Sequence, residues 1–155
     1  MTCIVYRDGV LACDSWVLDI WTKIGQFPKI AKRETRDGAI LFAASGNSGH
    51  CKTFLDWGRG DGFADWVSGQ YEPPSLGEGD NTATGMVFMP DGSCVRFDAG
   101  LPPYALQGPF FAIGSGSWVA LGALEAGATA EQAVEAAIKW DVGTNGPVRS
   151  LRHRD

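Results

Sequence analysis

The sequence predicts an α+β domain with four layers in the order αββα: two antiparallel sheets packed face to face, and a helix pair on each outer face. Three observations lead to this prediction. Antiparallel hairpins are too numerous for a doubly wound parallel sheet. The helical segments come in two batches along the chain. The length of 155 residues suits one domain, residues 1–155, and no repeat or linker divides it.

The first half of the chain predicts three strands and two short helices. TCIVYR and VLACDS form a hairpin, because Asp8-Gly9 between them is a strong type I′ turn signal. DGAILFAASG, residues 37–46, predicts a third strand. Residues 47–60 and 62–70 predict helices, since Phe54 and Trp57, and likewise Phe63 and Trp66, are spaced three apart.

The second half predicts a loop over residues 71–81 and then a second hairpin, 82–100, around Pro-Asp-Gly. PFFAIGSGS, residues 109–117, predicts a strand that runs into a glycine-rich turn. Residues 118–128 predict a helix. Residues 129–141 predict a longer one, which Thr129 opens with a Thr-x-x-Gln capping box. GPVRSLRH, residues 146–153, predicts a closing strand.

Composition excludes several classes of function. A net charge of -5 argues against a nucleic-acid partner, which needs clustered lysine and arginine. No apolar run approaches the roughly 18 residues of a membrane helix, and we expect neither a membrane partner nor a signal peptide. The four cysteines lack zinc spacing, so we expect free thiols, no metal, no cofactor and a cytoplasmic protein.

The first residues raise a chemical possibility at Thr2. Methionine before a small residue is normally excised during synthesis, which would give Thr2 a free α-amine beside its hydroxyl. Such an amine has a pKa of about 8 and can take the hydroxyl proton, so one residue supplies both base and nucleophile. If Met1 is retained, the amine is blocked and the chain is a zymogen or inactive. The alternative is that Met-Thr is simply a common beginning.

The opening hairpin brings an acidic residue close to Thr2. With Asp8-Gly9 as the loop, Arg7 pairs with Val10, and counting back sets Cys3 across from Asp14. Asp14 is then one residue step from Thr2. Strict strand alternation puts these two side chains on opposite faces, so we expect a twist or bulge at this end of the hairpin.

Several motifs follow in a characteristic order: TCIV with GVLACDS, then PKIA, LFAASGNSG, FFAIGSGSWVALGA and WDVGTNG. Together they resemble the proteasome β-subunit family of N-terminal-nucleophile hydrolases, which includes HslV-like peptidases. The resemblance covers nearly the whole chain. It implies the four-layer αββα fold of that family and a threonine peptidase that assembles as a ring.

The resemblance also implies roles for individual residues. Thr2 matches the nucleophile, Asp14 the aspartate of the ADS motif, and Lys29 the lysine that stabilises the alkoxide. Lys29 is preferred over Lys32 because Ile30 follows it, as the family pattern requires. The remaining matches are an oxyanion-hole glycine, a serine near the amine with the Asp-x-x-Ser pair that holds it, and small pocket residues: Gly46, Ser115, Asp141, Thr144, Ala44 and Ser48.

Each match has an ordinary alternative. Asp14 could cap a strand end, Lys29 could belong to a solvated basic cluster with Lys32 and Arg33, and GSGS could be no more than a helix N-terminus. The six tryptophans could serve a homo-oligomer interface or the core.

The leading hypothesis is a threonine endopeptidase in a homo-oligomeric, self-compartmentalised ring. It would act on peptides or unfolded proteins, with a separate ATP-driven unfoldase as a possible partner. A catalytically silent structural or scaffolding ring and a small-amide hydrolase on the same fold remain open.

Overall fold

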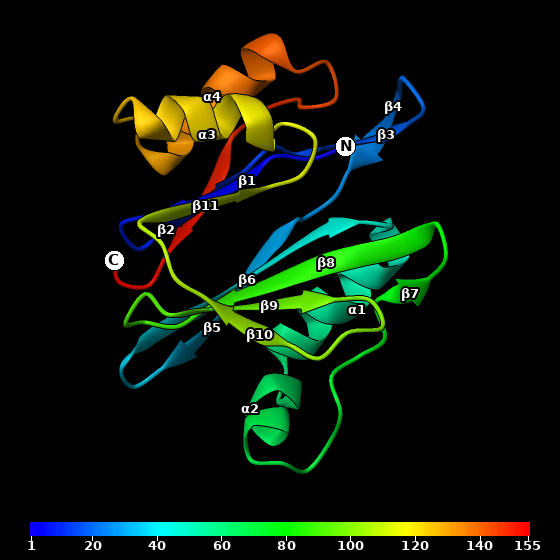
Figure 1. Cartoon of the computed structure of the whole chain (residues 1–155), viewed down its shortest axis with the longest axis vertical. Coiled ribbons are helices and arrows are strands. Elements are labelled where there is room, and N and C mark those ends of the chain that lie inside the picture. Colours follow the sequence, from blue (N-terminus) through cyan, green and yellow to red (C-terminus); the bar gives the residue numbers. More distant parts are fainter.

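The computed structural model describes residues 1–155, and all the long strand pairings are antiparallel (Figure 1). A four-stranded sheet has the order β11-β1-β2-β12, a six-stranded sheet has the order β10-β9-β8-β6-β5 with β7 paired to β8, and β3 and β4 form a two-stranded sheet. The strands are β1 Ile4–Arg7, β2 Val10–Cys13, β3 Trp16–Asp19, β4 Thr22–Gln26, β5 Ile30–Thr35, β6 Gly38–Gly46, β7 Gly77–Glu78, β8 Asn81–Phe88, β9 Cys94–Asp98, β10 Tyr104–Leu106, β11 Phe110–Ile113 and β12 Arg149–Arg152.

The opening hairpin forms as predicted. β1 pairs with β2 in the register Arg7↔Val10 to Ile4↔Cys13. Asp8 and Gly9 both have positive φ, +52° and +77°, as a type I′ turn requires. The second predicted hairpin appears as β8 and β9, and the predicted closing strand appears as β12.

The four helices are α1 Ser48–Arg59, α2 Gly62–Val67, α3 Ser117–Glu125 and α4 Ala130–Trp140. α3 and α4 lie against the outer face of the four-stranded sheet, and α1 lies against the outer face of the six-stranded sheet (Figure 1). The predicted capping box at Thr129 and Gln132 is present at the start of α4.

Central strands are buried on both sides, which explains their nearly continuous apolar sequences. Along β6, Ala39, Leu41 and Ala43 belong to the cluster between the two large sheets. The intervening Ile40, Phe42 and Ala44 pack toward α1 and α2. A third cluster joins β1 and β2 to α3 and α4.

The predicted fold class, a four-layer αββα sandwich of the N-terminal-nucleophile hydrolase type with a helix pair on each outer face, is wrong. The structure is a mixed α/β domain dominated by antiparallel sheets, with 37% of residues in strands and 25% in helices. The outer face of the six-stranded sheet carries one full helix, because α2 spans only six residues and packs chiefly against α1. Gly60 and Gly69 bound this segment closely and leave no room for a second long helix.

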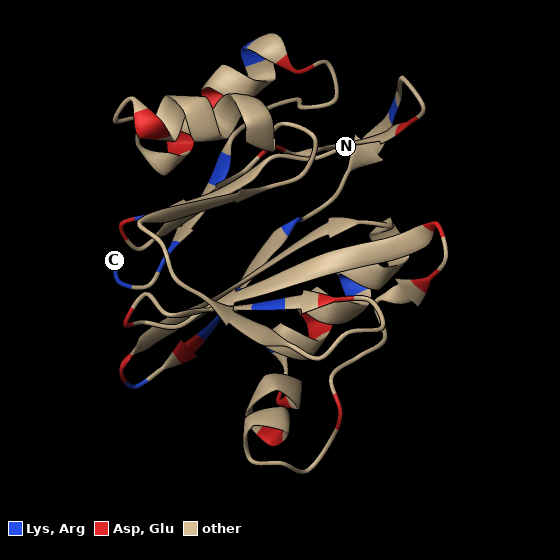
Figure 2. Cartoon of the chain, in the orientation of Figure 1, with Lys and Arg blue, Asp and Glu red and all other residues tan.

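The tryptophans differ in exposure, whereas the cysteines are all buried. Trp21, Trp118 and Trp140 are exposed, whereas Trp57 and Trp66 pack into the cluster under α1. All four cysteines are buried and free, as expected. No helix has both the length and the apolar character needed to span a membrane. Most charged residues lie in the turns, the loops and the helices, and β2, β6 and β8 carry none (Figure 2).

Candidate functional site

Thr2 lies just before β1 and against the turn between β11 and α3. Its amide nitrogen donates to Ser115 Oγ at 3.3 Å, and its carbonyl accepts from the Gly116 amide at 3.0 Å. A side chain at Gly114 would come within 2.1 Å of the Thr2 carbonyl oxygen, and Gly114 also has a φ of +96°. Glycine at 114 therefore lets this turn close directly over Thr2.

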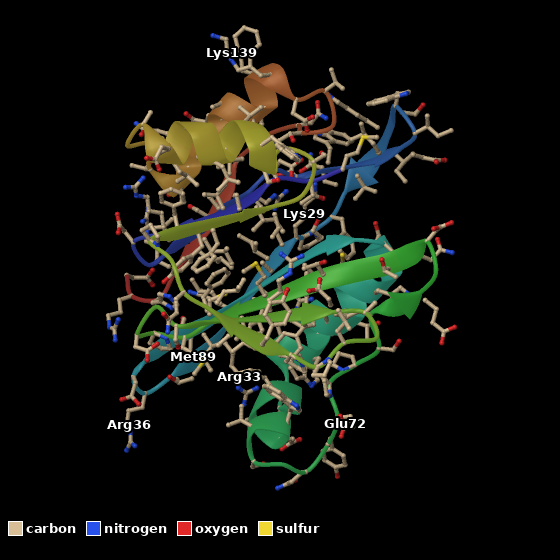
Figure 3. All side chains as sticks on the ribbon, viewed as in Figure 1. Lys29, Arg33, Arg36, Glu72, Met89 and Lys139 are labelled. Atoms are coloured by element: carbon tan, nitrogen blue, oxygen red, sulfur yellow. The ribbon has the colours of Figure 1, made fainter.

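Asp14 and Lys29 form a buried ion pair beside Thr2. Asp14 is fully buried, Lys29 is 4% exposed, and Asp14 Oδ1 lies 2.8 Å from Lys29 Nζ. Lys29 comes from the segment before β5, and its side chain extends into the space between the two large sheets (Figure 3). Burial of both charges is tolerated because each finds further hydrogen bonds.

Those further hydrogen bonds come from the backbone. Asp14 accepts from the Cys3 amide at 3.0 Å and from the Asn145 amide at 3.1 Å. Lys29 Nζ donates to the Trp16 carbonyl at 2.9 Å and to the Met1 carbonyl at 3.3 Å. Every partner of Lys29 Nζ is an acceptor, and the three partners match the three N–H groups that a lysine ammonium can donate.

We expected a twist or a bulge at this end of the hairpin, and the pairing of β1 with β2 contains no bulge. β1 begins at Ile4 and β2 ends at Cys13, so Thr2 and Asp14 lie beyond the strand ends, where alternation no longer dictates side-chain direction. The pairing still extends one step, since the Asp14 amide donates to the Cys3 carbonyl at 3.1 Å.

A second hydrogen-bonded group lies on the other side of Thr2. Ser115 Oγ donates to Asp141 Oδ2 at 3.0 Å, and Thr144 Oγ1 donates to the same oxygen at 2.6 Å. Asp141 is the C-cap residue of α4, and Thr144 is buried. One carboxylate oxygen therefore orients the serine whose hydroxyl meets the Thr2 nitrogen.

A cavity of about 70 Å³ opens next to Thr2. All fully buried side-chain polar atoms have hydrogen-bond partners, and the Thr2 hydroxyl has none, so this hydroxyl has access to the cavity rather than to the core. The lining residues come from the N-terminus, β3, the β4–β5 connection, β6 and α1: Met1, Thr2, Val17, Leu18, Phe27, Lys29, Ala44, Gly46, Ser48 and Cys51.

Gly46 ends β6 at the edge of this cavity. Its φ is +120°, and a Cβ there would lie 2.4 Å from the Thr82 carbonyl oxygen. α1 starts two residues later, where the Asn47 side chain caps the amides of Gly49 and His50. Ala44 is buried in the wall, and Ser48 is partly exposed at the rim.

The structure brings together all the residues singled out from the sequence. Thr2, Lys29, Gly46, Ala44 and Ser48 share the cavity. Asp14 pairs with Lys29, and Ser115, Asp141 and Thr144 form the chain that ends at the Thr2 nitrogen. Lys32, the rejected lysine, lies apart in an exposed ion pair with Glu34.

Sequence reasoning missed the groups that hold these side chains. The amides of Cys3 and Asn145 and the carbonyl of Trp16 act through the backbone, so their residue types carry no signal. It also missed one wall of the cavity, Val17, Leu18 and Phe27, since it made no prediction for β3 and β4. Cys51 shares that cavity, and burial raises the pKa of its thiol to about 11, so it remains neutral there.

No protein-family model matches the chain, and no curated protein is similar to it in sequence. Solved structures of Thiobacillus denitrificans BPH are similar to it. BPH in complex with epoxomicin is 19% identical, with 99% of each chain covered and a TM-score of 0.61. A second BPH structure is 21% identical, covering 97% of this chain and 95% of that one, also with a TM-score of 0.61. At such identities the likeness concerns the fold alone.

Proposed function

We propose that the protein is a threonine-type peptidase whose nucleophile is Thr2, exposed by removal of Met1. The observation that carries the proposal is the buried Asp14–Lys29 pair, because Lys29 lines the same small cavity as Thr2. Burying a lysine ammonium costs desolvation free energy, and buried charges of this kind are often found at functional sites. Stabilisation of an alkoxide on Thr2 is a function that accounts for its position.

The proposed reaction needs only groups of this site. The Thr2 amine takes the hydroxyl proton, directly or through a water, and the oxygen attacks a peptide carbonyl. The leaving amine takes up that proton, the C–N bond breaks and an ester acyl-enzyme remains. Water then cleaves the ester and regenerates the hydroxyl. Lys29 stabilises the alkoxide, and the Gly46 amide is the proposed oxyanion donor, a type of contact worth about 3 kcal/mol.

Ser115, Asp141 and Thr144 would orient the amine. In the chain with Met1, Ser115 Oγ already accepts from the Thr2 nitrogen at 3.3 Å. After removal of Met1, that nitrogen is the proposed base. A serine hydroxyl that donates to Asp141 keeps a lone pair directed at this amine.

Two further observations support the proposal. The ordered motifs that resemble proteasome β-subunits supply the residues that meet at this cavity. BPH, whose fold is similar, forms a complex with epoxomicin. Epoxomicin is an epoxyketone and offers two electrophilic carbons, which match the hydroxyl and the amine of an N-terminal threonine.

The proposed substrates are peptides and unfolded proteins, since the cavity is small and lies at the molecular surface. We further propose a homo-oligomeric ring that shields the Thr2 sites, with a separate ATP-driven unfoldase as a possible partner. The exposed Trp21, Trp118 and Trp140 suit such contacts. Four buried free thiols are consistent with a cytoplasmic location.

The decisive experiment combines intact mass with activity. Purified protein is weighed, incubated with epoxomicin, weighed again and assayed on fluorogenic peptides. We expect loss of Met1, one probe adduct per chain on Thr2 and cleavage of peptides. Thr2→Ala should lose the adduct and the cleavage. Retained Met1 in a preparation that still cleaves peptides would rule out this mechanism.

Lys29 and Lys32 provide the matched pair of variants. Lys29→Ala should lower kcat/KM about a thousandfold, because a positioned charge next to the nucleophile is lost. Lys32→Ala should be mild, because Lys32 lies in an exposed ion pair with Glu34. Thermal melts serve as the control for folding. If wild type without Met1 neither cleaves peptides nor takes up the probe, a silent scaffolding ring becomes the better assignment.

A further inference from the structure

Ser15 is a fully buried polar residue between the two groups that hold Lys29. Asp14 precedes it and supplies the carboxylate, and Trp16 follows it and supplies the carbonyl. The Ser15 amide donates to the Asn145 carbonyl at 2.9 Å, and its carbonyl accepts from the Phe27 amide at 3.1 Å. Ser15 therefore lies where β2, the β4–β5 connection and the segment before β12 converge.

The Ser15 hydroxyl is fixed from both directions. It donates to the Pro147 carbonyl and accepts from Arg149 Nε at 3.0 Å. A serine hydroxyl has one hydrogen and two lone pairs, so this pattern uses its donor and one acceptor position. The bond from the guanidinium is charge-assisted, and such bonds are about twice as strong as neutral ones.

Arg149 connects Ser15 to the two-stranded sheet. While its Nε reaches Ser15, its Nη2 donates to Gln26 Oε1 at 2.7 Å. Arg149 begins β12 and pairs with Cys13, whereas Gln26 ends β4 and pairs with Trp16. One guanidinium thus ties the four-stranded sheet to the base of β3, where the Trp16 carbonyl meets Lys29.

We propose that Arg149 is a positioning residue for the Lys29 ammonium, acting through Ser15 and the Trp16 carbonyl. This inference rests on the proposed function of the site. β3 and β4 form a small sheet that pairs with neither of the larger ones. The Arg149–Gln26 hydrogen bond connects this small sheet to the four-stranded sheet, and Arg149→Ala removes it. The Trp16 carbonyl then moves more freely, and Lys29 retains Asp14 as its better-fixed acceptor.

Arg152 is a matched control on the same strand. It also lies on β12, is solvent-exposed, and pairs with Glu131 Oε1 at 2.9 Å. Its partner belongs to α4 and has no contact with the Lys29 group. Arg152→Ala therefore removes an arginine from the same strand as Arg149. It breaks only an exposed ion pair, and such pairs contribute little to stability.

The kinetic test compares Arg149→Ala, Arg149→Lys and Arg152→Ala in the full chain. Arg149→Ala should lower kcat about tenfold with KM nearly unchanged, because an interaction beside the nucleophile is disturbed and not substrate binding. Arg149→Lys should recover only part of kcat, since a lysine cannot contact Ser15 and Gln26 with a fixed fork. Arg152→Ala should match wild type. Equal kcat values for the two alanine variants would overturn the proposal.

A second readout does not depend on peptidase activity. In protein labelled with ¹⁵N-lysine, the hydrogen-bonded Lys29 ammonium should give a slowly exchanging cross-peak, assigned by its loss in Lys29→Arg. Arg149→Ala should broaden this peak, and Arg152→Ala should leave it unchanged. An unchanged peak in Arg149→Ala, or no such peak in wild type, would overturn the positioning role. If wild type is inactive but the peak responds as expected, the proposed function fails and the positioning role stands.

The Ser15 link is tested by a double-mutant cycle on the same signal. If Arg149 acts through Ser15, Ser15→Ala alone should broaden the peak, and adding Arg149→Ala should have little further effect. Additive effects of the two substitutions would show that Arg149 acts by another route.

Discussion

At the residue scale, Gly46 is a position of the site where a side chain would overlap the backbone of a neighbouring strand. Its φ of +120° disfavours any L residue, and a Cβ there would lie 2.4 Å from the Thr82 carbonyl oxygen and 2.8 Å from Ala83 Cα. Both are backbone atoms of β8, which pairs with β6. Backbone atoms held in this pairing cannot rotate away as a side chain could. Gly46 thus couples the edge of the cavity to the pairing of two central strands.

Gly46→Ala should destabilise the protein by about 2–4 kcal/mol, since backbone strain and overlap with β8 add together. Gly69→Ala is the control: Gly69 has a φ of +82° but open space around its Cβ position, so only strain of about 1 kcal/mol remains. Urea unfolding of both variants measures the difference. Equal losses would show that overlap with β8 contributes nothing.

Side-chain chemistry was accessible from the sequence, but backbone chemistry was not. Thr2, Asp14 and Lys29 could be proposed because hydroxyl, carboxylate and amine are properties of residue types. The amide of Asn145 and the carbonyl of Trp16 belong to every residue, and only the fold selects these two. The same applies to Arg149, whose importance depends on where Ser15 and Gln26 lie.

At the element scale, α4 links a local sequence signal to the site. Thr129 Oγ1 accepts from the Gln132 amide at 3.1 Å, and Gln132 Oε1 accepts from the Thr129 amide at 2.9 Å. The same helix ends at Asp141, which holds Ser115 and Thr144. Stability is therefore built at its N-terminus, and the candidate chemistry lies at its C-terminus.

Thr129→Ala should reduce the free energy of unfolding by about 1 kcal/mol, the usual effect of losing an N-cap. Glu135→Ala is the control, because Glu135 is exposed in the same helix and forms no ion pair. Denaturant titrations report the loss. Under the proposed function, Thr129→Ala should keep the proposed peptide cleavage near wild type well below the melting temperature, since Asp141 is three turns away.

The two predicted hairpins and α4 carry local turn or capping signals, whereas the missed hairpin of β3 and β4 carries none. Asp8-Gly9 and Pro90-Asp91-Gly92 mark the two predicted hairpins, and Thr129 marks α4. The hairpin of β3 and β4 turns instead through Ile20, a β-branched residue with a φ of +56°, which no turn rule favours. Short strands such as β7 and β10 likewise depend on their neighbours, which a local pattern cannot supply.

At the scale of the whole molecule, the sequence predicted a helix pair on each outer face, and the structure has only one full helix on the outer face of the six-stranded sheet. The spacing of Phe63 and Trp66 correctly indicated helix, but it did not indicate length. Both aromatic rings pack edge-on or tilted against Trp57, and Trp66 also meets Phe97. Phe63 is the only buried residue of α2, with Trp66 partly buried beside it, so these contacts are made within six helical residues.

The buried thiols make the free energy of unfolding depend on pH in the alkaline range. Burial raises the pKa of Cys94 from 9.0 to about 12. Burial, together with Asp14, raises the pKa of Cys3 and of Cys13 to about 12 as well. Above about pH 9 the unfolded chain releases these protons while the folded chain retains them, so the free energy of unfolding falls as pH rises toward 12.

Urea unfolding between pH 8 and 11 measures this loss, and each thiol contributes a slope of up to about 1.4 kcal/mol per pH unit. Cys94→Ala should lower the slope by one thiol's share, whatever its effect at neutral pH. A thiol reagent at pH 8 should label the folded protein slowly and all four cysteines after unfolding. Rapid labelling of the folded state would contradict the burial that causes these shifts.

The C-terminal residues join the two large sheets at the end opposite Thr2. The His153 amide donates to the Gly9 carbonyl at 3.2 Å in the β1–β2 turn, and its carbonyl accepts from the Ala39 amide at 2.8 Å in β6. The ring is 5% exposed, with Nδ1 2.6 Å from the Ala39 carbonyl and Nε2 2.9 Å from the Tyr6 hydroxyl. With Nδ1 as donor, Nε2 accepts from Tyr6, and both ring nitrogens are satisfied.

His153→Ala should therefore destabilise the protein by about 2–4 kcal/mol, because it leaves the Ala39 carbonyl and the Tyr6 hydroxyl buried without partners. Tyr6→Phe alone should cost about 1–2 kcal/mol, and in the double variant the two losses should not add, since the Tyr6–His153 hydrogen bond is counted only once. Asp155→Ala, at the exposed end of the same segment, is the control and should match wild type. Urea unfolding at pH 7.5 compares these four variants with wild type. Additive losses would show that the Tyr6–His153 hydrogen bond contributes nothing to stability. A His153→Ala effect below about 0.5 kcal/mol, the range of ordinary surface substitutions, would show that the apolar cluster between the sheets holds them together without this C-terminal contact.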